Sequence, residues 1–148
     1  DVNMTYQHPN IKKFCILTWF FLLFIGCEDD TKPFPYVYID ATLYVNTQLN
    51  NIVEGEYVFL DGYGYGGLVI YRNGQRSYQA YDRACPYKPV KKCILERDTT
   101  WQGLLKCPCC SSSFLLYDDG RVFNGPAVRG LKQYDAYLIS PNELRVRN

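Results

Sequence analysis

Five cysteines lie close together in this sequence and restrict its folding more than any other feature. They stand at positions 85, 93, 107, 109 and 110. One group opens as Cys85-Pro86-Tyr87, and the other reads Cys107-Pro108-Cys109-Cys110. Small β-domains hold a metal ion or an iron–sulfur cluster between two short cysteine loops of this kind. The spacing therefore predicts a site at which the two loops meet.

The chain around these cysteines is predicted to be all-β. Short apolar or alternating runs are separated by turn residues, and no stretch after residue 36 has a convincing helical period. Asn73-Gly74, Asp119-Gly120 and Pro141-Asn142 each stand between two such runs, where they indicate hairpin turns. Many short antiparallel strands with regular turns predict a small sandwich or barrel. Each cysteine group follows a hairpin strand, so we expect both groups at one tip.

Length, charge and histidine content exclude several classes of function. A chain of 148 residues is long enough for one domain with a buried core. Lys and Arg number 16 against 15 Asp and Glu, whereas binding of nucleic acid by bulk charge needs a clear positive excess. The single histidine, His8, lies in a segment that we expect to be removed. We therefore expect neither a serine triad, nor a Cys–His dyad, nor a histidine-liganded metal.

The N-terminal segment has the pattern of an export signal. Lys12 and Lys13 precede the apolar run 14–25, which is shorter than the roughly 20 residues that a membrane-spanning helix needs. The run is followed by Gly26-Cys27, and a small residue directly before a cysteine resembles the lipobox of bacterial lipoproteins. In that family the cysteine is lipidated and becomes the new N-terminus. The alternative is a soluble secreted protein cut near Gly26, in which Cys27 is an ordinary thiol.

The expected organisation has three parts. Residues 1–26 form a signal peptide, residues 27–35 a lipid anchor and tether, and residues 36–148 the β-domain. The acidic residues directly after Cys27 resemble the surface-export signal of Bacteroidetes lipoproteins, or they form a plain solvated tether. We expect a lipoprotein that is attached to a membrane through its N-terminal lipid, in the periplasm or on the cell surface.

The order of motifs from Leu68 to Val146 resembles the Rieske iron–sulfur domain. The matching segments are the hairpin 68–74, the strand 78–86, the second cysteine loop 107–114, and then Asp119-Gly120, Gly125-Pro126-Ala127 and residues 131–134. The second loop reads Cys-Pro-Cys-Cys-Ser-Ser-Ser-Phe where the family usually has Cys-Pro-Cys-His-Gly-Ser-x-Phe. Gly-Pro-Ala resembles the proline loop that covers the cluster. The resemblance implies a small all-β domain whose two cysteine loops form the cluster-binding tip.

The resemblance also implies a ligand set, and this sequence departs from it at two positions. A Rieske site uses Cys-x-His and Cys-x-x-His, with two cysteines on one iron and two histidines on the other. Cys85 and Cys107 match the cysteines, whereas Tyr87 and Cys110 stand at the histidine positions. The high reduction potential that imidazole ligands give is therefore not expected.

Three interpretations of the cysteines remain open. The first is a [2Fe–2S] cluster on Cys85, Cys107, Cys110 and either Cys93 or Tyr87. The second is zinc on Cys85, Cys93, Cys107 and Cys110. The third has no metal, and disulfides such as Cys93–Cys109 staple the loops. Cys109 matches a position that forms a disulfide to the first loop in one Rieske subgroup.

Two functions from different classes follow from these interpretations. Export as an unfolded chain into an oxidising compartment favours disulfides and opposes a cluster. The prediction is therefore a structural or binding module that keeps the fold without a cofactor. The alternative is a cysteine-ligated [2Fe–2S] or zinc protein, which as a redox protein would be an electron-transfer component with a redox partner. Retention of Cys85, Cys107 and Cys110 favours the alternative, and the sequence names no protein partner.

Overall fold

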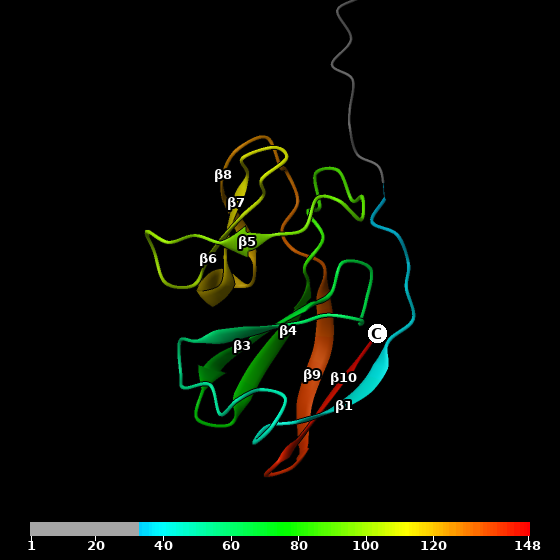
Figure 1. Ribbon diagram of the computed structural model, residues 1–148, viewed down its shortest axis with the longest axis vertical. Coiled ribbons are helices and arrows are strands. Elements are labelled where there is room, and N and C mark those ends of the chain that lie inside the picture. Colours follow the sequence, from blue (N-terminus) through cyan, green and yellow to red (C-terminus); the bar gives the residue numbers. More distant parts are fainter. Residues whose placement is uncertain (1–32) are drawn as a thin grey trace, which may run out of the picture.

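A computed structural model describes residues 33–148, and this part of the chain is built from strands (Figure 1). The strands are β1 (Asp40–Tyr44), β2 (Tyr57–Leu60), β3 (Leu68–Gly74), β4 (Ser77–Asp82), β5 (Glu96–Arg97), β6 (Leu104–Lys106), β7 (Ser113–Leu115), β8 (Arg121–Asn124), β9 (Gln133–Ser140) and β10 (Glu143–Arg147). One short 3-10 helix, η2 (Leu116–Asp118), follows β7, and residues 33–148 contain no α-helix. The predicted all-β fold is confirmed.

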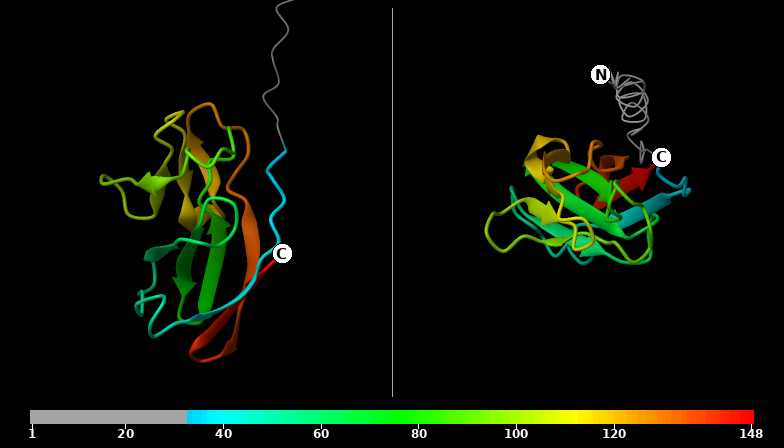
Figure 2. Two further views of the ribbon diagram at one scale, coloured as in Figure 1. Left: turned by 45° about the vertical axis from the view of Figure 1, so that its right-hand side comes forward. Right: turned by 90° about the horizontal axis from the view of Figure 1, so that it is seen from above.

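The strands form two antiparallel sheets of unequal size. The base sheet has six strands in the order β1-β10-β9-β4-β3-β2, and the tip sheet has four in the order β5-β6-β7-β8. Figures 1 and 2 show the base sheet curled into an open half-barrel, with the tip sheet at one end of it. The chain passes from the base sheet to the tip sheet after β4 and returns at β9.

Strand β3 separates two hydrophobic cores. Side chains of successive strand residues point to opposite faces. Val69 and Tyr71 therefore lie in one core, and Leu68 and Ile70 lie in the other. All four are buried, which explains why this strand is a continuous apolar run rather than an alternating one.

We call these two cores the tip core and the base core. The tip core consists of Tyr57, Val69, Tyr71, Tyr81, Cys85, Cys93, Leu95, Leu105, Cys107, Phe114, Leu116, Ala127 and Leu131. The base core consists of Ile39, Leu43, Val45, Leu49, Ile52, Leu68, Ile70, Tyr78, Ala80, Tyr134, Leu144 and Val146. Three cysteines thus belong to the tip core, so the cysteine loops are packed into the fold rather than hanging from it.

Asn73-Gly74 does not form the predicted two-residue turn. Strand β3 continues through Gly74, its pairing with β4 shifts register between Arg72 and Gly74, and the turn falls on Gln75 and Arg76. The Arg72 guanidinium donates to the carbonyl oxygens of Gly74 and Gln75, at 3.1 and 2.6 Å. These bonds fix the backbone carbonyls of Gly74 and Gln75, so the turn forms after Gly74. The register shift between Arg72 and Gly74 is a β-bulge, which accommodates one extra residue in β3.

The other two predicted turns are present. Pro141 and Asn142 join β9 to β10. Asp119 and Gly120 lie between η2 and β8 with φ of 50° and 68°, in the left-handed region that Asp and Gly tolerate best. Strands β5 and β6 were not predicted, because two and three residues are too few to show an alternation.

Candidate metal centre

Two loops carry the five cysteines to the tip of the molecule. The first cysteine loop, residues 83–95, joins β4 to β5, and the second, residues 107–112, joins β6 to β7. The first is closed like a hairpin, because the Cys85 N–H donates to the Cys93 carbonyl oxygen at 2.9 Å. Both loops start from paired strands, so their cysteines are held at defined positions.

Three free thiols lie together where the two loops meet. The Sγ atoms of Cys85, Cys107 and Cys110 all lie within 4.8 Å of one another, and the Cys85 and Cys110 sulfurs are 3.6 Å apart. Cys85 and Cys107 are buried in the tip core, and Cys110 is half-buried. In the second loop the Cys107 N–H donates to the Ser112 carbonyl oxygen at 2.8 Å. Thiolates are soft ligands that select zinc, copper(I) and iron–sulfur centres, so these residues form a candidate metal centre.

The surroundings of Cys85 and Cys110 affect their ionisation in opposite directions. Burial, assisted by the neighbouring Cys107, raises the pKa of the Cys85 thiol. Burial also opposes ionisation of Cys110, but hydrogen bonds with the side chain and backbone of Ser112 and with the Cys107 and Cys85 thiols together outweigh it and lower the pKa of Cys110. The Cys110 sulfur lies 3.2 Å from the Ser112 hydroxyl oxygen. Since the thiolate is the metal-binding form, Cys110 is the better prepared ligand of the two.

A disulfide ties the two loops together beside the thiols. Cys93 of the first loop is bonded to Cys109 of the second, with their Cα atoms 5.7 Å apart. This is the pair that the family resemblance suggests. A disulfide sulfur is not a thiolate, so Cys93 is not available as a metal ligand in this structure. It therefore does not supply the fourth ligand that the predicted zinc set needs. Of the four cysteines in the predicted zinc set, the structure brings Cys85, Cys107 and Cys110 together.

Tyr87, which the family resemblance places at the first histidine position, is a packing residue. Its side chain is partly buried against the tip core. The Lys88 ammonium lies 5.5 Å from the centre of its ring, within the range of a cation–π contact. The aromatic ring thus fills the edge of the core beside the first cysteine loop.

The loop Gly125-Pro126-Ala127 lies against the second cysteine loop. The Ala127 N–H donates to the Ser112 hydroxyl at 3.0 Å, so Ser112 contacts both Cys110 and the covering loop. Gly125 has φ of 102°, and a Cβ atom there would lie 2.5 Å from the Ser112 Cα. Only glycine permits so close an approach in this conformation.

Replacing Gly125 with alanine is expected to lower the free energy of unfolding by about 2 kcal/mol, because the new methyl group overlaps the Ser112 backbone. Gly55→Ala is the matched control. Gly55 also has a positive φ, 86°, but nothing lies within 4 Å of its would-be Cβ, so only backbone strain of about 1 kcal/mol is expected. Urea denaturation of both variants measures the difference. Equal losses would show that the contact with Ser112 is unimportant.

Asp82 links three parts of the fold near the site, and sequence reasoning missed it. It ends β4 fully buried, and its carboxylate accepts hydrogen bonds from the N–H groups of Tyr65 (2.6 Å), Gly66 (3.0 Å) and Ala84 (2.8 Å). The Tyr134 hydroxyl donates to the same carboxylate at 2.8 Å. Ala84 directly precedes the first cysteine, so Asp82 fixes the entry to that loop. The available signal was an acidic residue at the end of a strand, directly before the cysteines and near a glycine-rich segment in the sequence.

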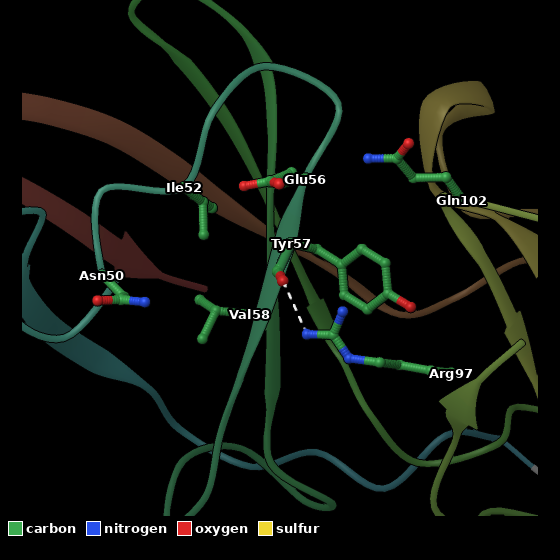
Figure 3. A pocket seen from close by; sticks show the side chains of 7 residues that line it. All are labelled: Asn50, Ile52, Glu56, Tyr57, Val58, Arg97 and Gln102. Atoms are coloured by element: carbon green, nitrogen blue, oxygen red, sulfur yellow. Dashed lines mark hydrogen bonds between the residues drawn. The ribbon is translucent and has the colours of Figure 1, made fainter. Parts of the chain in front are cut away.

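A separate hollow of about 300 Å³ lies between the base sheet and the tip sheet (Figure 3). It is lined by Asn50, Ile52, Glu56, Tyr57, Val58, Arg97 and Gln102. Arg97 of β5 donates to the Tyr57 carbonyl oxygen of β2 at 3.1 Å, and its guanidinium lies 4.4 Å from the centre of the Tyr57 ring. These contacts join the two sheets, and no cysteine lines the hollow.

The predicted export features lie outside the described residues. The signal peptide, Cys27 and most of the tether belong to residues 1–32. Within residues 33–148, no helix has the length and apolar character needed to cross a membrane.

Comparisons with known proteins assign the fold to a family. The chain matches the model of the Rieske [2Fe–2S] domain over residues 42–135. The plasma membrane Rieske protein PetC3 from Synechocystis PCC 6803 has a similar structure, with a TM-score of 0.54 and 21% identity over 73% of this chain and 99% of that one. A chain of the complex of reduced oxygenase and oxidized ferredoxin in carbazole 1,9a-dioxygenase gives a TM-score of 0.49 and 16% identity, over 74% of this chain and 93% of that one. No curated protein matches. The family match covers more than half of the sequence, and the chain belongs to the Rieske [2Fe–2S] domain family.

Proposed function

We propose that this chain is an exported, lipid-anchored protein whose Rieske-fold tip binds metal through cysteine thiolates. The observation that carries the proposal is the meeting of three free thiols from two separate loops, with all sulfurs within 4.8 Å. Rieske domains hold an iron–sulfur cluster at this place in the fold and use it for electron transfer. A redox-active metal at this tip would require a protein partner that exchanges electrons with it.

The side chains at the tip do not fit the family's own cluster. That cluster needs two cysteines on one iron and two histidines on the other. The resemblance places Tyr87 and Cys110 at the histidine positions, and the Cys110 sulfur, which lies 3.6 Å from the Cys85 sulfur, is a thiol and not an imidazole. The Rieske cluster is therefore not the group that we propose for this chain.

A module without any metal is the second candidate. The Cys93–Cys109 disulfide favours it, because this bond already holds the two loops together. In that case the tip would serve as a structural or binding surface. The two candidates differ in the state of the three thiols and in metal content, so one experiment separates them.

Elemental analysis of the protein, purified after export and without oxygen, is the test of metal binding. We expect bound metal in the unaltered protein and its loss in Cys110→Ala. Ser111→Ala is the matched control, because Ser111 is the next residue in the same loop, is exposed, and has no thiol. A metal-free protein with three titratable thiols would contradict the proposal and favour the structural module.

Lipid anchoring is tested by Cys27→Ala. We expect the variant to lose incorporation of labelled fatty acid, since Cys27 supplies the thiol for lipidation in the proposed lipoprotein. Cys15→Ala is the control, because Cys15 lies in the apolar run before the expected cleavage site. Unchanged labelling of the Cys27 variant would rule out the anchor.

A further inference from the structure

We infer that Cys85, Cys107 and Cys110 bind one closed-shell, thiophilic cation, Zn²⁺ or Cu⁺, as a three-thiolate site. The inference rests on the proposed function, in which the tip binds metal through cysteines, and it specifies how many ions the site holds and of what class. The distances between the sulfurs, the number of available thiols and their burial each support it.

The distances match ligands of a single ion. Sulfurs that are each about 2.3 Å from one ion lie about 3.8 Å apart in tetrahedral geometry and about 4.0 Å apart in trigonal geometry. The Cys85 and Cys110 sulfurs are 3.6 Å apart, and Cys107 completes a triangle with no side above 4.8 Å. A cluster with two irons divides its ligands between two metal positions. The three sulfurs here are close enough together to be ligands of one metal ion.

The number of available thiols also favours a single ion. Residues 33–148 contain five cysteines, and the disulfide takes Cys93 and Cys109. Three thiols remain, which is one ligand fewer than a four-thiolate cluster needs. Zn²⁺ has no geometric preference from its d electrons and accepts three protein ligands with a fourth from solvent. The half-buried Cys110 marks the side from which solvent reaches the site.

Burial makes a cation necessary once the thiols ionise. Cys85 is 1% exposed and Cys107 is fully buried, so three thiolates placed together would be costly without an opposite charge. Zn²⁺ on three thiolates leaves one net negative charge, and Cu⁺ leaves two. Thiolate ligands bind both ions well, so the ligand set alone does not choose between Zn²⁺ and Cu⁺. The experiment below distinguishes the two ions.

The experiment is a metal titration of the full chain with its disulfide intact. The protein is stripped of metal without oxygen and titrated with Zn²⁺ alone and, separately, with Cu⁺ alone, each against a competing chromophoric chelator. We expect one equivalent of one of these ions to bind. Outer-sphere changes at metal sites cost about 10–100-fold in affinity, so removal of a ligand in Cys85→Ser, Cys107→Ser or Cys110→Ser is expected to cost more than about 100-fold. Circular dichroism checks that each variant is folded.

The double variant Cys93→Ala/Cys109→Ala distinguishes three ligands from four. It is expected to keep one ion per chain with an affinity within about 10-fold of that of the unaltered protein, because neither residue is a ligand in the inferred site, whereas loss of a fourth ligand would weaken binding more than about 100-fold. Two irons per chain with a visible absorption band in the exported protein would overturn the single-ion inference and leave thiolate metal binding intact. Failure to bind Zn²⁺ or Cu⁺, or a Cys85–Cys110 disulfide in the exported protein, would overturn both.

Discussion

Replacement of Asp82 with alanine is expected to lower the free energy of unfolding by about 4 kcal/mol. The carboxylate is fully buried and accepts four hydrogen bonds, three from backbone N–H groups and one from the Tyr134 hydroxyl. Removal of the acceptor leaves two buried donors, the Ala84 N–H and the Tyr134 hydroxyl, and two partly buried N–H groups without this partner. Each unsatisfied buried donor costs about 1–3 kcal/mol. Thermal and urea unfolding of the purified domain measure the loss.

A graded series separates the hydrogen bonds from the charge. Asp82→Asn keeps the size of the side chain and one carbonyl oxygen, so we expect a loss of about half that of the alanine variant. Asp135→Asn is the matched control, because Asp135 is an exposed carboxylate on β9 and its loss is expected to change stability by less than about 0.5 kcal/mol. If Asp82→Ala were as stable as Asp135→Asn, the proposed role of the carboxylate would be wrong.

The position of Asp82 also connects stability with the metal centre. Its bond to the Ala84 N–H fixes the residue directly before Cys85, and its bond to the Tyr65 N–H fixes the glycine-rich segment beside it. Burial, together with the neighbouring carboxylate, raises the pKa of Tyr134, so the phenol remains a hydrogen-bond donor over the ordinary pH range. The network thus positions the first cysteine loop from the base sheet.

Apolar patterns and turn residues were sufficient to predict the fold class. Strands such as β3 and β10 appear in the sequence as apolar runs or alternations, because burial of one or both faces restricts their residues. The exact turn after β3 was not predictable, since it depends on the side-chain bonds of Arg72 to Gly74 and Gln75. The dipeptide Asn73-Gly74 indicates that a turn is near, but it does not show at which residues the turn falls.

The sequence was sufficient to predict that cysteines form the site, but not which of them form a disulfide and which remain free. The order of Cys85 and Cys107 in the family motif indicated that two loops meet. Which cysteines are bonded and which remain free depends on distances across the two loops, and five cysteines allow many arrangements. The structure pairs Cys93 with Cys109 and leaves Cys110 facing Cys85. Asp82 was missed because three of its four donors, the N–H groups of Tyr65 and Gly66 and the Tyr134 hydroxyl, come from two segments that are distant in the sequence.

The double variant Cys93→Ala/Cys109→Ala is expected to lose about 3 kcal/mol of stability. The bonded residues are 16 positions apart, and a crosslink that closes a loop of this length restricts the unfolded chain by about that amount. For a domain of this size the midpoint of thermal unfolding is expected to fall by roughly 10 °C. Both cysteines are changed together so that no unpaired thiol is left to exchange with the other three.

The comparison of this variant with and without metal shows how the two crosslinks of the tip are related. The disulfide and the inferred ion each join the first cysteine loop to the second, so either one limits the motion that the other would restrict. Loss of the disulfide is therefore expected to lower the midpoint more in the metal-free protein than in the protein with one bound ion, because an ion that stays on its thiolates already restricts the unfolded chain as the disulfide does. Addition of a chelator during the same thermal scan measures the difference. Equal shifts in both forms would mean that the thiol site does not hold the two loops together.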